Sequence, residues 1–325
     1  MNAFVLAGDQ KNDGQNQNKA FLLLEGRPLL LYVLRAIDGV EGVDKIYIVG
    51  PQSQIMNVIE AALPEVPFHK TLKVIEQRGG LLENVLYAYN DALADLKKEG
   101  NTESDPPALF MSADIPLVTS SEIQQFIQDA DMTAYDYCLG ITPASVLSQF
   151  YPKRGRPGIK MAYLYLKEKI CRMNNLHLVR PYRIGAMGYI QNMYDHRHQR
   201  SIINRLKISK VVFQSACGMK GIVVYLLAQV ATLLARIGLP SLALPCRAFL
   251  STRGVERQVS SLLKTRFRFV ETTRGGSALD IDDETTYQVM RTVFREWRVR
   301  LSLEERPGEG RSSPSVCHLG AGSCP

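Results

Sequence analysis

Carboxylates and one lysine stand beside apolar, strand-like runs at three places in the chain. Asp114 ends the run ALFMSAD, Asp280 and Asp282 lie two residues apart in ALDIDDETTY, and Lys19 follows a polar loop that begins at Gly8. A carboxylate at the end of a buried strand is well placed for Mg²⁺, which takes one or two carboxylates together with waters and phosphates. Two carboxylates on one face of an extended segment repel each other unless a cation neutralises them. These residues therefore predict metal-assisted chemistry on a phosphate compound.

Each of these residues also has a purely structural interpretation. Asp114 could form an Asx turn, Asp282 could favour the N-terminus of a final helix, and Lys19 could be a solvated surface residue. The loop after Gly8 matches neither the Walker A pattern nor the Rossmann fingerprint. A turn after the first strand of an α/β sheet still presents backbone N–H groups to a phosphate. We expect Gly8 and Lys19 to lie at such a phosphate site.

The segments around these residues alternate between strand and helix patterns. Apolar strands are expected at 3–7, 45–50, 72–77 and 108–114, with helices at 28–37, 53–63 and 83–98 between them. Thr119 and Glu122 are spaced as a capping box for a further helix. Continuous apolar runs are typical of parallel strands that helices cover on both faces. The order predicts an α/β fold with a doubly wound, mixed but mostly parallel sheet, which binds ligands beyond the carboxyl ends of its strands.

The regular alternation breaks down after residue 140, and this divides the chain into four parts. We expect an α/β core at 1–141, a helical insertion at 142–264, a returning strand and helix of the core at 265–303, and a disordered tail at 304–325 that is rich in Gly, Ser and Pro. The insertion is expected to form an acceptor-binding subdomain.

Two polar groups in the insertion are candidates for binding an anionic acceptor. Arg156 and Lys160 belong to a basic, glycine-containing loop, and Asn175, His177 and Arg180 belong to a polar cluster that also includes Arg172. The alternatives are a solvated basic loop and buried residues that hydrogen-bond to one another.

Composition excludes several classes of protein. The chain has 325 residues, of which 46% are hydrophobic and 22% charged, so it is neither wholly disordered nor collagen-like. Its net charge of +7 favours anionic partners, but no nucleic-acid-binding motif is present and we expect no nucleic acid. The six cysteines form no CxxC pair, and the N-terminus does not have the pattern of a signal peptide, which predicts a cytoplasmic protein.

Residues 221–238 form the most apolar stretch of the chain. Gln229 and Arg236 interrupt it, and its apolar run is shorter than the ~20 residues that usually span a bilayer. We expect a buried core helix here, with membrane contact as the alternative.

Five segments together resemble the MobA-like nucleotidyltransferases, a family with a GT-A-like fold. They are FVLAG, NKAFLLLEGRPLLLYVLRAI, KIYIVG, LFMSADIPLV and ALDIDDETTY, in that order. The resemblance extends over about residues 1–130 and 266–300. It implies an NTP held on Leu6, Ala7, Gly8, Lys19 and Gln77, so that residues 1–141 would be the nucleotide-binding core.

The same resemblance implies catalytic roles for Lys19 and Asp114 and a Mg²⁺ (or Mn²⁺) site formed by Asp114, Asp280 and Asp282. An oxygen of a phosphorylated small-molecule acceptor would attack the NTP, and pyrophosphate would leave. The loop departs from the family pattern AGGxxxRMGxxK, because Asp9 replaces the second glycine and the arginine is missing. Two alternatives therefore stay open, a nucleotide-sugar glycosyltransferase and a nucleotide-binding regulatory protein without catalysis.

Overall fold

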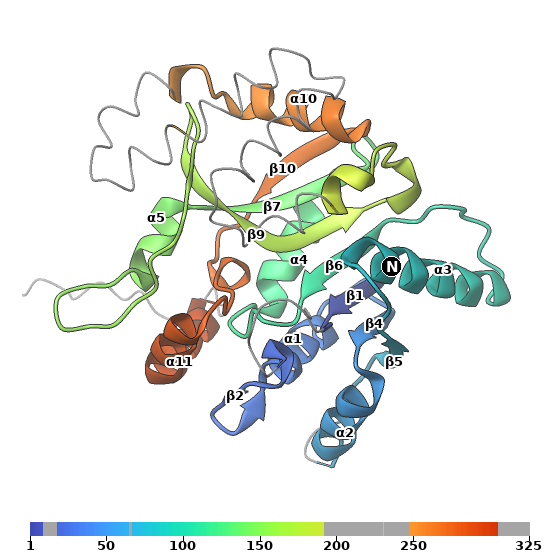
Figure 1. Ribbon diagram of the computed structural model, residues 1–325, viewed down its shortest axis with the longest axis horizontal. Helices are drawn as coiled ribbons and strands as arrows, with labels where there is room; N and C mark the ends of the chain where they lie inside the picture. Colours follow the sequence, from blue (N-terminus) through green and yellow to red (C-terminus); the bar gives the residue numbers. More distant parts are fainter. Residues whose placement is uncertain (9–17, 65–66, 192–229, 231–246, 305–325) are drawn as a thin grey trace, which may run out of the picture.

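The computed structural model describes residues 1–8, 18–64, 67–191, 230 and 247–304, and it is built around one central sheet (Figure 1). The strands lie in the order β10-β7-β9-β6-β1-β4-β5. Their bounds are β1 Asn2–Leu6, β4 Lys45–Gly50, β5 Thr71–Glu76, β6 Ala108–Ser112, β7 Tyr137–Pro143, β9 Ile170–Val179 and β10 Phe267–Glu271. The short strand β8 (Leu164–Tyr165) pairs with β9, and β2 (Leu23–Leu24) and β3 (Arg27–Pro28) form a separate hairpin.

The sheet is mixed but mostly parallel. β1 pairs in parallel with both β4 and β6, β4 with β5, and β10 with β7. β9 runs antiparallel to both of its neighbours, β6 and β7, and β8 runs antiparallel to β9. This confirms the expected fold class, and it places the carboxyl ends of the parallel strands along one edge of the sheet.

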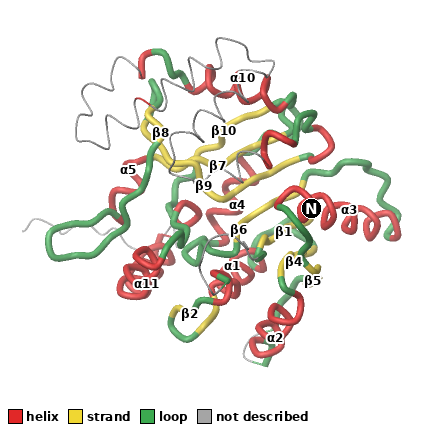
Figure 2. The backbone as a smooth tube through the Cα atoms, in the orientation of Figure 1, coloured by secondary structure: helices red, strands yellow, loops and turns green. Residues whose placement is uncertain are grey.

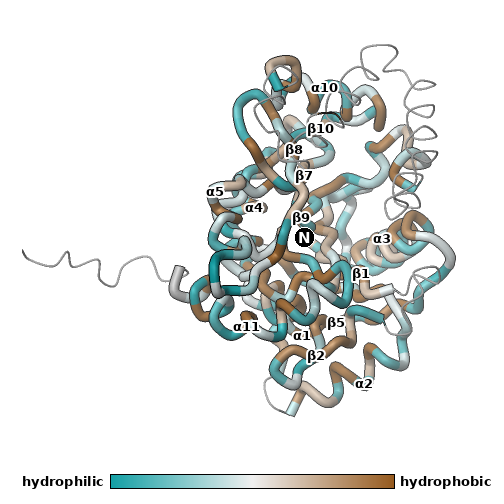
Figure 3. The backbone as a smooth tube through the Cα atoms, turned by 60° about the vertical axis from the view of Figure 1, so that its left-hand side comes forward, coloured by the Kyte–Doolittle hydropathy of each residue, from teal (hydrophilic) through white to brown (hydrophobic). Residues whose placement is uncertain are grey.

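Helices cover both faces of the sheet (Figure 2). On one face α1 (Leu29–Asp38), α2 (Gln52–Ala62) and α4 (Ser120–Asp129) bury an aliphatic core against the strands. On the other face α3 (Leu81–Lys98) packs over an aromatic group that includes Phe4, Tyr47, Tyr89 and Phe110, and α10 (Thr252–Leu263) covers β10. Figure 3 shows hydrophobic stretches around α1, β2 and α2, with hydrophilic stretches between them.

Most of the expected elements are confirmed to within a few residues. The strand predicted at 108–114 ends at Ser112, so Asp114 lies in the loop beyond β6. Pro28 is the N-cap of α1, and the final helix is α11 (Glu284–Glu304), which packs on the short helices α5 (Ala144–Leu147) and η2 (Ser148–Phe150) through Phe150 and Trp297.

The predicted helical insertion differs from the structure at 170–179. These residues form β9, which lies between β7 and β6 inside the central sheet (Figure 1). Asn174 and His177 interrupt its apolar pattern, and both are hydrogen-bonded within the sheet. Polar side chains with partners inside the protein are compatible with a central strand, which the sequence pattern alone does not show.

Three other expectations concern segments that the structure describes little or not at all. The loop 9–17, nearly all of the apolar stretch 221–238, and the tail from 305 onwards lie outside the described residues. In the part of the chain that the structure describes, no helix is both long and apolar enough to cross a membrane.

Candidate active site

Two segments far apart in the sequence are joined at the carboxyl end of β6. The backbone N–H of Ile281 donates a 3.1 Å hydrogen bond to the carbonyl oxygen of Asp114. Ile281 is 1% exposed and packs into the core under α11. Because side chains alternate along extended backbone, Asp280 and Asp282 on either side of Ile281 point away from that core. The fold thus brings both of them to Asp114.

The three carboxylates and Lys19 form one electrostatic group. Loss of hydration and the carboxylate of Asp280 raise the pKa of Asp114 to about 6, whereas the Ser112 hydroxyl that donates to it and the Lys19 ammonium act in the opposite direction. Asp282 is exposed, yet partial loss of hydration and the carboxylates of Asp280 and Asp114 also raise its pKa. A cation at this position would relieve the repulsion.

One arginine already compensates part of this negative charge. Arg172, near the start of β9, donates from Nη2 to Oδ1 of Asp280 over 2.6 Å, and both side chains are 19% exposed. The sequence placed Arg172 in a polar cluster but gave no reason to pair it with Asp280. That pairing depends on β9 lying in the sheet, where its Asn175 also contacts the turn at Ser277.

Both described ends of the expected phosphate loop, at Ala7 and Asn18, are held by hydrogen bonds. Ala7 is buried and its N–H donates to Val49, while the Asn18 side-chain amide donates to the Ala7 carbonyl oxygen over 2.8 Å. Leu6 accepts from the N–H of Ala113. Leu6 and Ala7 therefore support the loop, and Gly8, which is exposed, is the residue of the three that is open to a ligand.

Gln77 and a residue that the sequence analysis missed flank Gly8. A Cβ atom on Gly8 would lie 3.0 Å from Oε1 of Gln77 and 4.0 Å from Nδ2 of Asn84. Asn84, in the first turn of α3, accepts from the N–H of Arg78 over 2.5 Å and so orders the turn that follows Gln77. The Gly79–Gly80 pair that precedes α3 was the available signal. A side chain at residue 8 would therefore meet the Gln77 side chain, which the glycine avoids.

A comparison of the sequence with models of known protein families helps to interpret this geometry. Residues 3–206 match the family model described as the MobA-like NTP transferase domain. This chain belongs to that family. The resemblance inferred from five segments is confirmed, and the family is one of enzymes, as expected.

The MobA-like assignment agrees with two further comparisons. A curated relative, a 2-C-methyl-D-erythritol 4-phosphate cytidylyltransferase from Geotalea uraniireducens (strain Rf4), is 28% identical over 138 residues, which cover 42% of this chain and 55% of that protein. The chain therefore spans about half the length of this curated relative. The solved structure of a hypothetical transferase from Thermus thermophilus is 22% identical, covers 87% of this chain and 97% of its own, and gives a TM-score of 0.58, which indicates a shared fold.

The carboxylates of this MobA-like site suit a magnesium ion, which takes some of its ligands from substrate and water. They suit a metal ion coordinated by protein side chains alone less well. Among the described residues, no group of three or more His, Cys, Asp or Glu side chains is arranged to hold a metal. Mg²⁺ needs only one or two carboxylates when substrate phosphates and waters supply its other ligands. Asp114 and Asp280, with Asp282 beside them, provide carboxylates that repel one another without a cation.

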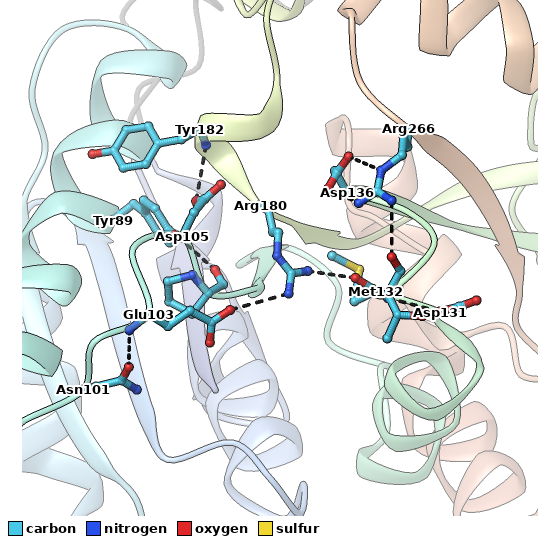
Figure 4. Close-up of polar contacts among 12 residues, drawn as sticks. Tyr89, Asn101, Glu103, Asp105, Asp131, Met132, Asp136, Arg180, Tyr182 and Arg266 are labelled. Carbon is cyan, nitrogen blue, oxygen red and sulfur yellow. Dashed lines mark hydrogen bonds and ion pairs between the residues drawn. The ribbon is translucent and has the colours of Figure 1, made fainter.

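Arg180 lies at the other end of β6 from Asp114, and its expected role in acceptor binding stays a prediction. Val179 pairs with Ala108 at the first residue of β6, whereas Asp114 follows Ser112, the last residue of that strand. Arg180 instead donates to the Met132 carbonyl oxygen and lies 3.5 Å from Glu103 (Figure 4). Arg172 lies near the start of the ten-residue strand β9 and Arg180 follows its end, so the two arginines lie at opposite ends of the strand.

His177 and Asn175 have partners inside the protein. His177 pairs through Nδ1 with the Tyr137 hydroxyl at 2.9 Å, and loss of hydration lowers its pKa to about 4, so the ring is neutral at physiological pH. Asn175 donates from Nδ2 to the Ser277 carbonyl oxygen over 3.2 Å. His177 thus supports the sheet and Asn175 the 276–278 turn, and contact of either residue with the acceptor stays a prediction.

The basic loop presents Arg156 and Lys160 to solvent. Arg156 lies in a tight turn with Lys153 and stands 4.0 Å from Glu296 of α11, with 72% of its side chain exposed. Lys160 is exposed as well. Neither residue has a described contact with the carboxylate group, so a role in acceptor binding stays a prediction for both.

Proposed function

We propose that this chain is a Mg²⁺-dependent nucleotidyltransferase that transfers an NMP group from an NTP to a phosphorylated small molecule. The observation that carries the proposal is the hydrogen bond from Ile281 to Asp114, which assembles the acidic group in a MobA-like fold. The name of the curated relative, a cytidylyltransferase of a sugar alcohol phosphate, supports the choice of a phosphorylated acceptor. Location in the cytoplasm stays a prediction.

In the proposed reaction an acceptor phosphate oxygen forms a bond to the α-phosphorus of the NTP. The bond from the α-phosphorus to the oxygen that bridges to the β-phosphorus breaks, and pyrophosphate leaves with that electron pair. This chemistry needs positioning and charge neutralisation, and it needs no protein nucleophile. A Mg²⁺ or Mn²⁺ ion, held by Asp114 and Asp280 with Asp282 nearby, would supply positive charge to the phosphates when bound.

The chain's own residues have separate roles in this proposal. Gly8 lets the nucleotide approach the end of β1 beside Gln77 and Asn84, and Lys19 places a cation near the phosphates. Arg172, held by Asp280, would meet an anionic acceptor at the metal. An arginine can contact a carboxylate and a phosphate at the same time because its guanidinium has five N–H donors.

The experiment that tests this function measures pyrophosphate release. Each of CTP, GTP, ATP and UTP is incubated with the protein, Mg²⁺ and a panel of sugar phosphates and alditol phosphates, starting with the acceptor in the relative's name. Release that needs both acceptor and Mg²⁺, and that disappears in Asp114→Asn, supports the proposal. Parallel reactions with UDP-sugars and GDP-sugars test the glycosyltransferase alternative.

The outcomes separate the remaining candidates. Transfer of sugar without release of pyrophosphate would assign a glycosyltransferase. Binding of an NTP without either reaction, on an extended acceptor panel, would favour a regulatory nucleotide-binding protein.

A further inference from the structure

A buried carboxylate in α4 contacts the segment that carries Asp280 and Asp282. Glu122 is 0% exposed and lies in the first turn of α4. Its N–H donates to Thr119 Oγ1 over 3.2 Å, which is half of the predicted capping box. In a complete box the carboxylate would return to the N–H of Thr119. Here it accepts from Ser277 instead, from the N–H over 3.0 Å and from the Oγ hydroxyl over 2.6 Å.

Ser277 is held on its other side as well. Its carbonyl oxygen accepts from Asn175 of β9, so the N–H, hydroxyl and carbonyl groups of this 0% exposed residue all have partners from other elements. The preceding Gly276 packs directly on the chain after Asp114, since a Cβ atom there would lie 2.0 Å from the Leu117 carbonyl oxygen. The turn η5 (Gly276–Ala278) therefore has a fixed position against α4, β9 and the Asp114 loop.

Ser277, in this fixed turn, is only three residues from Asp280. After Ser277 come Ala278 and Leu279, both 1% exposed in the core under α11, and then Asp280 and the hydrogen-bonded Ile281. Because this connection is short and buried, the position of Ser277 restricts where the two carboxylates can lie. Glu122 is thus an anchor at one end of this segment, and Asp114 is the anchor at the other.

Stability alone does not explain a carboxylate at this position. Burying a charged group is costly, and apolar replacements of buried ionic groups are often neutral or stabilising. Burial raises the pKa of Glu122 to about 7, although the hydrogen bonds from Ser277 act against this rise. The side chain nevertheless supplies two acceptor oxygens to two donors of one residue, which a leucine or methionine would leave unpaired.

We propose that Glu122 is a positioning residue that fixes the Ser277 turn and thereby sets where Asp280 and Asp282 stand relative to Asp114. The link to metal and nucleotide rests on the proposed function. The structural part, that Glu122 holds the Ile281–Asp114 contact in place, does not depend on it.

Two buried carboxylates provide a matched pair of variants. Glu122→Ala removes the anchor, and Asp105→Ala removes a carboxylate that is 8% exposed and accepts from Tyr89 at the opposite edge of the sheet (Figure 4). Glu122→Gln keeps one acceptor oxygen and the side-chain shape. Ser277→Ala removes only the hydroxyl donor, and it serves as the second test if Glu122→Ala does not fold.

Hydrogen exchange at the Ile281 amide and Mn²⁺ binding are the two readouts. At equal loss of melting temperature, Glu122→Ala should speed exchange at Ile281 more than Asp105→Ala does. It should also weaken Mn²⁺ binding, followed by electron paramagnetic resonance, by roughly 10-fold, as expected for a residue behind metal ligands. Glu122→Gln should recover most of both effects.

Equal exchange at Ile281 in Glu122→Ala and Asp105→Ala would overturn the positioning role. If Ile281 exchange responds as expected while the wild-type protein binds neither Mn²⁺ nor an NTP, the positioning role stands and the proposed function fails. A response of Mn²⁺ affinity without one at Ile281 would place the effect of Glu122 elsewhere and contradict the inference.

Discussion

The backbone N–H of Ile281 and the carbonyl oxygen of Asp114 are 3.1 Å apart from donor to acceptor. This contact joins the loop beyond β6 to the segment that returns after β10, so the candidate site is completed only by the C-terminal part of the chain. The loop beyond β6 supplies Asp114, and the returning segment supplies Asp280 and Asp282. Together they form an acidic group next to Lys19, at the edge where a parallel sheet binds its ligands.

Gly8→Ala should weaken nucleotide binding without unfolding the protein. The new Cβ would approach the flexible Gln77 side chain, which can move, so the free energy of unfolding should change by less than about 0.5 kcal/mol. It would occupy the space where a nucleotide would meet the end of β1. Gly188→Ala is the control, because nothing lies within 4 Å of its Cβ position. Titration of each variant with Mg-NTP checks this; equal affinity in both would place the nucleotide elsewhere.

Arg172→Met should destabilise the metal-free protein more than the Mg-NTP complex. Without the guanidinium, Asp280 loses a charged hydrogen bond beside Asp114, at a cost of about 1–3 kcal/mol. A bound cation restores part of the missing positive charge. Melting temperatures in EDTA and in Mg-NTP measure the difference. An identical loss in both conditions would show that Arg172 and the cation do not share Asp280.

Glu122 should make the folded protein less stable as the pH rises from about 4.5 towards 7. Its pKa is raised to about 7 in the folded state, so between these values the folded protein binds more protons than the unfolded chain. The free energy of unfolding is highest below about pH 4.5, the pKa of Glu122 in the unfolded chain. It falls by about 3 kcal/mol in total as the pH rises to about 7, the pKa of Glu122 in the folded protein. Urea unfolding of wild type and Glu122→Gln across this range should show the variant gaining relative stability, and parallel curves would contradict the shift.

His177 should have the opposite pH dependence. Its pKa is lowered to about 4 in the folded state, so the unfolded chain takes up the proton first as the pH falls. The stability it contributes is present above about 6.5 and lost towards 4, again about 3 kcal/mol. His177→Phe removes this dependence, and it also leaves the Tyr137 hydroxyl without its partner. Denaturant unfolding of wild type and variant at pH 4.5, 5.5 and 7.5 tests the sign.

The sequence predicts the parallel part of the fold well because buried parallel strands are apolar throughout. β1, β4 and β6 read as strands for that reason, and Asp114 marks the end of one. β9 was missed because polar residues such as Asn174 interrupt its apolar pattern, and the partners that satisfy them, Thr142 and Thr272, lie far away in the sequence.

Part of the candidate site was predicted because the apolar strands could be recognised and its residues follow them. Residue types and their places after strands suggested Asp114, Asp280 and Lys19. The sequence could not show that Glu122 turns towards Ser277, or that Arg172 meets Asp280. Both contacts depend on where the segment 276–282 packs against α4 and β9. Spacing within one helix or strand can be recognised in the sequence, whereas contacts between distant segments cannot.

The most direct test of the central claim is thermal stabilisation by CTP, GTP, ATP and UTP, each with Mg²⁺ and with EDTA, in wild type and Asp114→Asn. A ligand at 100 times its Kd adds about 2.7 kcal/mol to the free energy of unfolding, which shifts the melting temperature clearly. The account predicts stabilisation by at least one NTP that needs Mg²⁺ and is lost in Asp114→Asn, while the variant without ligand melts at or above the wild-type temperature. Stabilisation that persists in Asp114→Asn, or no stabilisation of the wild type by any Mg-NTP, would contradict the assignment of this acidic group as a nucleotidyltransferase centre.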